Sequence, residues 1–289
     1  MRLIAFIVFP PLAAAQELGY LAEEGLDLSV EITPSSTELM EGIARGRWDV
    51  ALSLFDNLLA CTMRYGVQMV AFAVTDIRNL SFYARPEIAD YAALRGRRIA
   101  ADAVDTAVAL VLRKLLLAHG LDYARGDYEL EAVGGQPQRL ESMLRGETYA
   151  AMLGPPESAA AAAAGFRRLG HHSEVLPDYP GSTIAARASW LAEPANRDAV
   201  VRLLRAWQRG AAWATEPANR EAAIALVQRA QQASREGAIA LLDAVATDIR
   251  PNPAGFAGVR DLRVELGLIP PPGPDVEPYY DLSLVREAS

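Results

Sequence analysis

Short apolar stretches of strand length alternate with longer stretches of helical periodicity along most of the chain. Residues 26–32 place apolar side chains at every second position, which is the period of a half-buried strand. Further strands are predicted at residues 3–8, 50–53, 67–74, 80–85, 128–133, 150–153, 174–176 and 183–188, and residues 94–101 are predicted to be a turn that runs into a strand. Strands that alternate with helices in this way favour an α/β fold.

Glycines mark the ends of several predicted helices. Gly25, Gly66 and Gly120 each follow a helical stretch, and glycine readily adopts the backbone conformation that ends a helix. Helices are predicted at residues 12–24, 38–45, 57–65, 107–119, 139–144, 158–164, 196–213, 220–231 and 235–249, and the last three are long and amphipathic. The proline-rich residues 270–274 are predicted to be stiff and extended.

One phrase occurs twice, 100 residues apart. Residues 44–52 and 144–152 each leave a helical stretch, turn at a glycine and enter a short apolar run. A polar or loop-forming cluster follows each run, at residues 53–57 and 154–158. The repeat predicts two similarly built α/β lobes. Because open α/β sheets bind ligands beyond the carboxyl ends of their strands, two such lobes would face each other across a ligand cleft.

The chain is long enough for two domains of about 100–150 residues each. Residues 1–82 and 185–289 are predicted to form a discontinuous first lobe, into which residues 83–184 are inserted as a second lobe. The long helices after Thr183 indicate the return to the first lobe. No low-complexity linker is present, so two short crossings, near Tyr83 and Thr183, are expected to act as hinges.

Composition narrows the possible partners. The 289 residues carry a net charge of −8 and offer no basic patch, so neither nucleic acid nor an anionic membrane surface is expected as a partner. No run reaches the roughly 20 apolar residues of a membrane span. Residues 1–15 have some features of a minimal signal peptide, but we interpret residues 3–8 as the first strand. The protein is expected to be periplasmic if an export signal has been removed, and cytoplasmic otherwise.

Several motifs follow one another in a fixed order, namely residues 19–28, 46–51, 94–100 and 115–121, then Gly134-Gly135, Arg139, Gly146, Pro155, Gly165 and Leu169. In this order and spacing, over about residues 3–190, the chain resembles the type 2 periplasmic-binding-protein fold. It is most similar to substrate-binding proteins of ABC importers in the nitrate/taurine/sulfonate and thiamine-pyrimidine-precursor group. Tyr149 departs from the family pattern, which usually has aspartate there.

The resemblance implies a two-lobed fold with an interlobe cleft that closes on a small organic ligand, with no cofactor, and a possible ABC permease as partner. The same fold also hosts decarboxylases, lyases and synthases, so the fold alone does not settle the function.

Asp102, Asp105 and Thr106 lie where a strand of the second lobe runs into a helix. Helix N-termini favour anions, but a carboxylate at this place caps the helix itself and repels an incoming anion. One reading is that an aspartate serves only as a helix cap. The other is that the aspartates favour a ligand that is neutral or carries an amine or a heterocyclic N–H.

Further candidate ligand-binding residues come from both lobes. Ser35, Ser36 and Thr37 open a helix of the first lobe, where one hydroxyl suffices as a cap and the others are spare donors. Aromatic cleft walls are typical of small-molecule sites, although core packing explains Phe55 nearly as well. The remaining candidates follow strands or form loops at the same edge: Phe9, Pro10, Ser53, Phe55, Asp56, Asn57, Gly134, Gly135, Gln136, Gly154, Pro155 and Tyr179.

No metal site and no catalytic centre are predicted. His171 and His172 are adjacent, so in a strand they would point to opposite faces, and no two histidines have helical metal-ligand spacing. The single cysteine, Cys61, has no identifiable base nearby in the sequence.

The leading hypothesis is a monomeric receptor that closes on a small organic ligand for an ABC importer, without covalent chemistry. The alternatives are a cytoplasmic enzyme of the same fold that uses Asp102 or Asp56 in acid–base chemistry, and a ligand-sensing protein.

Overall fold

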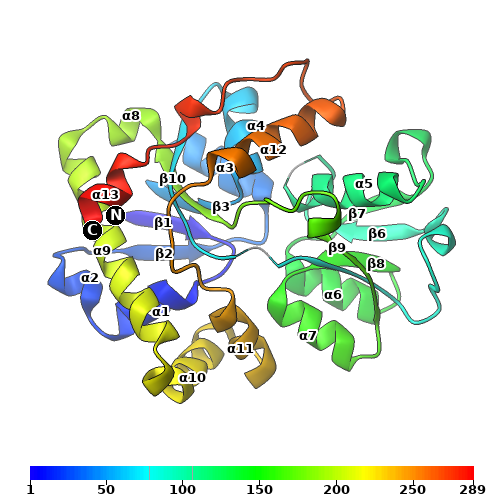
Figure 1. The fold of residues 1–289 in the computed structure, drawn as a ribbon, viewed down its shortest axis with the longest axis horizontal. Coiled ribbons are helices and arrows are strands. Elements are labelled where there is room, and N and C mark those ends of the chain that lie inside the picture. Colours follow the sequence, from blue (N-terminus) through cyan, green and yellow to red (C-terminus); the bar gives the residue numbers. More distant parts are fainter. Residues whose placement is uncertain (78, 106) are drawn as a thin grey trace.

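The computed structural model describes residues 1–77, 79–105 and 107–289 and contains two five-stranded sheets (Figure 1). The strand order is β2-β1-β3-β10-β4 in the first sheet and β7-β6-β8-β5-β9 in the second. The strands are β1 (Arg2–Ala5), β2 (Ser29–Ile32), β3 (Val50–Ser53), β4 (Met69–Val74), β5 (Ser81–Ala84), β6 (Arg98–Ala101), β7 (Glu129–Ala132), β8 (Ala150–Leu153), β9 (Arg167–His171) and β10 (Thr183–Arg187).

The two sheets share one topology. In the first, β1 pairs in parallel with β2 and β3, and β10 lies antiparallel between β3 and β4. In the second, β6 pairs in parallel with β7 and β8, and β5 lies antiparallel between β8 and β9. We call each sheet with its packed helices a lobe. The two-lobed α/β fold is confirmed.

Helices cover both sheets. They are α1 (Pro10–Glu17), α2 (Tyr20–Glu23), α3 (Ser36–Ala44), α4 (Phe55–Tyr65), α5 (Val108–Ala118), α6 (Gln136–Leu144), α7 (Pro155–Ala163), α8 (Ala188–Leu191), α9 (Pro194–Thr215), α10 (Arg220–Gln231), α11 (Arg235–Asp243), α12 (Pro253–Glu265) and α13 (Ser283–Ala288). Within the described ranges, no helix is both long and apolar enough to cross a membrane.

The repeated phrase folds the same way in both lobes. It runs from α3 into β3 in the first lobe and from α6 into β8 in the second. Gly46 has φ 77° and Gly146 has φ 78°, so both turns need the left-handed backbone that glycine adopts without a steric penalty. The flanking helices correspond as well. Helices α3 and α6 begin 100 residues apart, and so do α4 and α7.

Several sequence-based boundaries are wrong. The helix predicted at 12–24 is two helices, α1 and α2, because Gly19 between them has φ 77°. The strand predicted at 174–176 does not form, and a 3-10 turn spans His172–Glu174 instead. The helix predicted at 235–249 ends at Asp243, after which Val245 forms a bridge with Asp76 in the first crossing.

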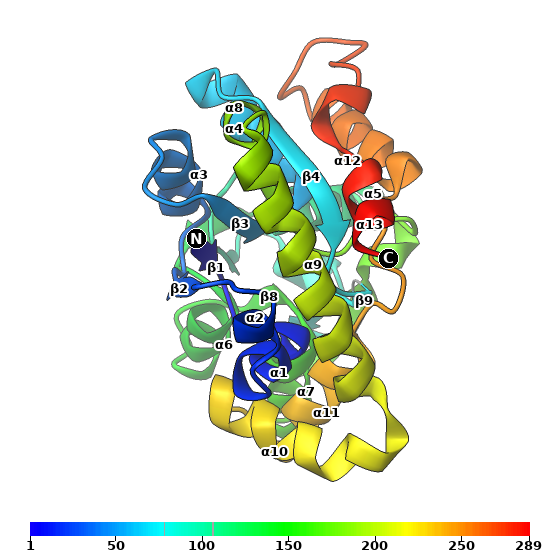
Figure 2. The same ribbon diagram turned by 90° about the vertical axis from the view of Figure 1, so that its left-hand side faces the viewer.

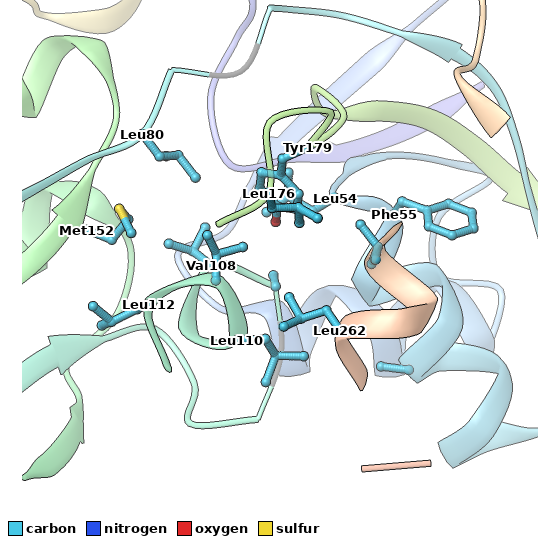
Figure 3. Packing of buried hydrophobic residues seen from close by; sticks show 14 of the residues in the cluster. Leu54, Phe55, Leu80, Val108, Leu110, Leu112, Met152, Leu176, Tyr179 and Leu262 are labelled. Atoms are coloured by element: carbon cyan, nitrogen blue, oxygen red, sulfur yellow. The ribbon is translucent and has the colours of Figure 1, made fainter. Parts of the chain in front are cut away.

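Two hydrophobic clusters account for most of the core. One lies within the first lobe, where Trp207 of α9 packs against α1. The other is continuous across both lobes, because it contains Leu54 and Phe55 of the first lobe, Val108 and Leu112 of α5, and Leu262 of α12 (Figure 3).

The lobes are joined by more than the two crossings, which lie at residues 75–80 and 172–182. Helix α11 packs on α7, and α12 packs on both α4 and α5 (Figures 1 and 2). The C-terminal helices therefore bridge the lobes on two sides.

Candidate functional site

A chain of hydrogen bonds crosses between the lobes at the N-terminus of α3. The Asn57 amide nitrogen lies 2.9 Å from Ser53 Oγ and 3.3 Å from Ser36 Oγ. The Ser36 hydroxyl in turn donates to Asp102 Oδ2 of the second lobe at 2.6 Å. These four residues were all predicted as ligand-binding candidates, and the structure brings them together where β3, α3, α4 and the end of β6 meet.

Two acceptor oxygens at this point have no partner among the described residues. They are Asn57 Oδ1 and Asp102 Oδ1, both of them buried. The direction of the hydrogen bonds sets which Asn57 atom stays free, because its nitrogen donates to the two serines. We call these two oxygens the open acceptors. Buried polar atoms are normally hydrogen-bonded, so the pair of open acceptors on facing lobes calls for a donor, supplied by ordered water or by a ligand.

Arg139 of α6 lies buried behind the second-lobe side of the site. It is 4% exposed, and its Nη1 donates to Met152 O at 2.7 Å. Burial lowers the pKa of Arg139, while the negative charges of Asp102 and Glu157 act in the opposite direction. Its Nε also has no partner within the described part of the chain.

Glu157 adds a second carboxyl on the same side. It lies in the first turn of α7, at the position that matches Asn57 in the repeat, 100 residues earlier. Burial raises the pKa of Glu157, and Arg139 acts in the opposite direction. The second lobe thus surrounds one buried arginine with two carboxyl groups.

Asp56 belongs to a different arrangement. Its carboxylate receives two bonds from Arg263 of α12, at 2.6 Å to Oδ1 and 3.0 Å to Oδ2, and a third from the backbone N–H of Ala107. Asp56 is 1% exposed and Arg263 4%. Arg263 also reaches the carbonyl oxygen of Asp105 at 3.3 Å. Asp56, Arg263 and the backbone of Asp105 and Ala107 form what we call the interlobe latch.

The other hydroxyl and acidic candidates have partners elsewhere. The Ser35 side chain caps α3 by accepting from Glu38 N, and Thr37 is exposed. The Asp105 carboxylate pairs with Arg64 at 2.6 Å. Thr106 lies outside the described residues.

The predicted aromatic walls pack into the core. Phe9 contacts Trp207 within the first lobe, next to the buried Pro10. Phe55 stacks on Phe256 of α12 with ring centroids 3.8 Å apart. Tyr179 is buried in the second crossing, close to the ring of His172.

The predicted second-lobe loops lie at the same edge as Asp102. Gln136 accepts from Gly154 N and so ties the start of α6 to the start of α7, which begins at Pro155. Gly134 has φ 113°, and Gly135 is the buried N-cap of α6.

The histidine expectation needs a correction. The rings of His171 and His172 lie 4.2 Å apart rather than on opposite faces, because β9 ends at His171 and the chain turns there. Among the described residues, no group of three or more His, Cys, Asp or Glu side chains is placed to hold a metal ion.

Two open surface hollows lie away from the open acceptors. One, of about 470 Å³, lies beside α9 and the C-terminus, and the other, of about 310 Å³, lies beside the crossings. Neither is lined by Ser36 or Asp102.

Sequence reasoning missed Arg139, Glu157 and Arg263 as parts of these arrangements. The sequence pattern indicates Arg139 only as part of the family motifs. The 100-residue repeat, which aligns Glu157 with Asn57, was the one sequence signal that could have identified Glu157. Arg263 lies 207 residues from Asp56 and follows no repeat.

Comparisons with known proteins agree with this architecture. The model of the NMT1-like family matches residues 3–228. No curated protein sequence matches the chain significantly. The periplasmic nitrate-binding protein NrtA from Synechocystis PCC 6803 is structurally similar with a TM-score of 0.82 and 16% identity, over 99% of this chain and 87% of that one.

Two further solved structures show the range of proteins that share this fold. The alkanesulfonate-binding protein SsuA from Xanthomonas axonopodis pv. citri, bound to MOPS, has a TM-score of 0.80 and 14% identity, over 97% of this chain and 98% of that one. The desulfurization enzyme DSZB has a TM-score of 0.67 and 15% identity, over 99% and 98%.

Proposed function

We propose that this chain, which belongs to the NMT1-like family, is a solute-binding receptor of an ABC importer. Its two lobes close on a small organic ligand at the open acceptors and release that ligand unchanged. The binding proteins for nitrate and alkanesulfonate share its fold over nearly their whole length, which supports the receptor reading. Such a receptor acts as a monomer in the periplasm, with the sheet of β1–β4 and β10 in one lobe and the sheet of β5–β9 in the other, close to the division predicted at residues 1–82, 83–184 and 185–289.

The observation that carries the proposal is the pair of open acceptors. One is supplied by Asn57 of the first lobe and the other by Asp102 of the second, and both flank the Ser36 hydroxyl. A ligand with N–H groups would bond to both lobes at once. Since an unpaired buried acceptor costs about 1–3 kcal/mol, such a ligand stabilises the closed form.

Charge favours a neutral or amine-bearing ligand over an anion. Asp102 lies at the site itself and Glu157 lies close by, so two carboxyl groups face the one buried arginine among them, Arg139, whose Nη1 donates to Met152 O and whose Nε has no partner among the described residues. An anion would therefore meet a carboxylate across a poorly screened space. Neutral amides, amines and N–H heterocycles avoid this repulsion.

An acid–base role for Asp56 has no support from its surroundings. Its carboxylate accepts from Arg263 at both oxygens and from Ala107 N. A general base needs a free lone pair within reach of the substrate proton. Asp102 keeps a free acceptor oxygen, so it is the residue left for such a role, and we propose binding without turnover on the likeness to the binding proteins for nitrate and alkanesulfonate.

A thermal-shift screen tests the ligand class, because binding to the folded state raises apparent stability. We expect amines and N–H heterocycles to raise Tm, and methanesulfonate, nitrate and phosphate to leave it unchanged. The opposite ranking, with anions as the strongest stabilisers, would contradict the proposed ligand class.

A pair of matched variants then tests the site. Asp102→Asn removes the charge of one open acceptor. It should lower the affinity for the most stabilising compound by about tenfold or more. Asp105→Asn alters a carboxylate three residues away whose side chain pairs with Arg64, and should leave the affinity unchanged. Equal effects of the two substitutions would show that the ligand binds elsewhere.

A further inference from the structure

The two lobes are held in the arrangement seen here, which we call closed, by contacts between their own residues. The hydrophobic cluster that spans the lobes places Phe55 of α4 on Phe256 of α12, and Val108 of α5 in the same cluster. Directly beside this contact, Asp56 follows Phe55 in the chain and forms the ion pair of the interlobe latch.

The interlobe latch joins three separate segments. Asp56 comes from α4 of the first lobe, and Arg263 comes from α12, which packs on both lobes. The backbone N–H of Ala107 and the carbonyl of Asp105 come from the segment before α5 of the second lobe. Opening of the lobes at this point removes the Ala107 bond from Asp56 and the Asp105 bond from Arg263.

The chemistry of the interlobe latch makes it selective for the closed form. The partners of Asp56 named above are all N–H donors, and the carboxylate lies at the N-terminal end of α5, where negative charge is favoured. The N-cap residue of α5, Ala107, makes no side-chain cap bond of its own. A carboxylate of one lobe thus satisfies a helix end of the other.

We infer that Asp56 and Arg263 are positioning residues that keep the lobes closed in the absence of ligand. The inference concerns closure alone and goes beyond the proposed receptor function. Its test uses no ligand, so failure of the inference and failure of the receptor proposal are distinguishable.

The test measures the distance between spin labels on the two lobes of the unliganded protein. Glu41→Cys on α3 and Glu141→Cys on α6 carry the labels, since both side chains are exposed and each pairs with an arginine four residues on. The native Cys61 is buried, and burial raises its pKa to about 11, so it stays unlabelled in the folded protein.

We expect one short-distance population in the otherwise unaltered protein. Asp56→Asn leaves Arg263 without its countercharge and should add a longer-distance population, with the open-to-closed ratio raised about tenfold or more. Arg263→Lys keeps the countercharge, so this variant should fold. Because lysine cannot bond both carboxylate oxygens and the Asp105 carbonyl together, the open-to-closed ratio should also rise, but less than in Asp56→Asn.

Two matched controls separate closure from general stability. Arg64→Gln removes an exposed interlobe ion pair with Asp105 and should leave the distances unchanged. Asp49→Asn removes an ion pair with Arg2 inside the first lobe and should also leave them unchanged. An unliganded protein that is already open before any latch substitution, or an Arg263→Lys protein whose distances coincide with the unaltered ones, would overturn the inference.

Discussion

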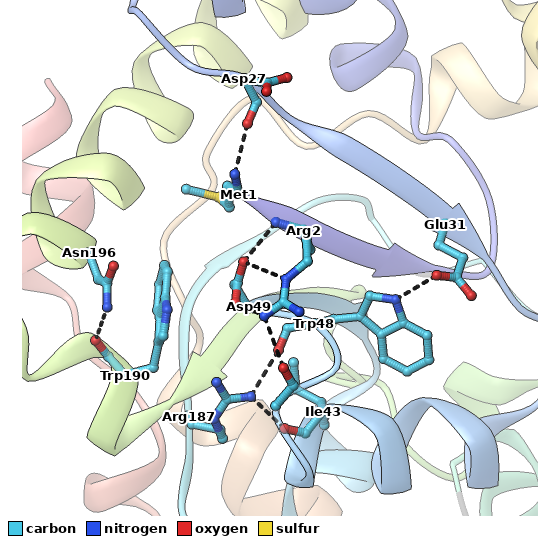
Figure 4. A network of polar contacts seen from close by, with 11 residues as sticks. Met1, Arg2, Asp27, Glu31, Ile43, Trp48, Asp49, Arg187, Trp190 and Asn196 are labelled. Carbon is cyan, nitrogen blue, oxygen red and sulfur yellow. Dashed lines mark hydrogen bonds and ion pairs between the residues drawn. The ribbon is translucent and has the colours of Figure 1, made fainter.

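Asp49 and Tyr149 occupy matching positions in the two copies of the repeated phrase, yet they make different contacts within their lobes. Asp49 binds the Arg2 guanidinium at 2.7 Å and the Arg2 backbone N–H at 2.8 Å (Figure 4). Tyr149 instead lies between two arginines, with guanidinium carbons 4.6 Å (Arg97) and 5.4 Å (Arg85) from its ring centroid. The departure from the family pattern thus exchanges an ion pair for cation–π contacts.

Asp49 gives a pH-dependent prediction at the residue scale. Partial burial raises the pKa of the Asp49 carboxyl, but the hydrogen bonds and charge of Arg2 outweigh this and hold the pKa below its ordinary value. A carboxyl whose pKa is lowered by folding stabilises the protein above its unfolded pKa of about 3.9 and ceases to do so as pH falls through the folded value.

Asp49→Asn should therefore cost about 1 kcal/mol of unfolding free energy at pH 7. The difference from the unaltered protein should shrink below about pH 4. Denaturant unfolding at several pH values measures both. Asp198→Asn, which removes an exposed ion pair with Arg202 on one face of α9, is the control expected to change little. A difference that is independent of pH would show that the Asp49 charge contributes nothing.

At the scale of elements, the contact between α1 and α9 depends on the absence of a side chain. A Cβ added at Gly210 of α9 would lie 2.1 Å from the carbonyl oxygen of Pro11 and 3.1 Å from Ala15 N. Both are backbone atoms of α1, so the overlap cannot be relieved by a side-chain rotation.

Gly210→Ala should destabilise the protein by about 1–2 kcal/mol, because overpacking outweighs the roughly 1 kcal/mol that alanine gains over glycine in a helix. Gly258→Ala in α12 is the matched control, since its added Cβ would meet only the Leu176 side chain, at 3.2 Å. Chemical denaturation compares the two. Equal stability of both variants would refute the close approach of α1 and α9.

The sequence pattern predicted most elements and missed those that tertiary contacts create. Strand β9 was not predicted, because its residues Arg167–His171 have no alternating apolar side chains. It forms at the sheet edge by pairing with β5. Helix α12 contains Gly255 and Gly258, which lower helix propensity, and it is stabilised by the stack of Phe256 on Phe55.

The same limit applies to the site. The serines and Asp102 were identified because helix N-termini after strands can be located from sequence. Asp56 was expected to face a ligand, but it binds Arg263 instead. This contact spans 207 residues of sequence, so no local pattern encodes it.

At the scale of the whole molecule, the two lobes meet at two polar contacts. Ser36 and Asp102 join them at the open acceptors, and the bonds of the interlobe latch to the backbone of Asp105 and Ala107 join them on the α4–α5–α12 side, beside the hydrophobic cluster that spans both lobes. The account therefore assigns ligand recognition to the first contact and closure to the second.

Native mass spectrometry tests the central claim, that the closed lobes bind one small ligand and release it unchanged. The protein is incubated with the most stabilising compound of the thermal-shift screen, and both the complex and the recovered compound are weighed over time. The account predicts a one-to-one complex with the monomer and full recovery of the compound at its original mass. Conversion of the compound to a new mass, in a reaction that Asp102→Asn abolishes, would contradict it and identify an enzyme instead.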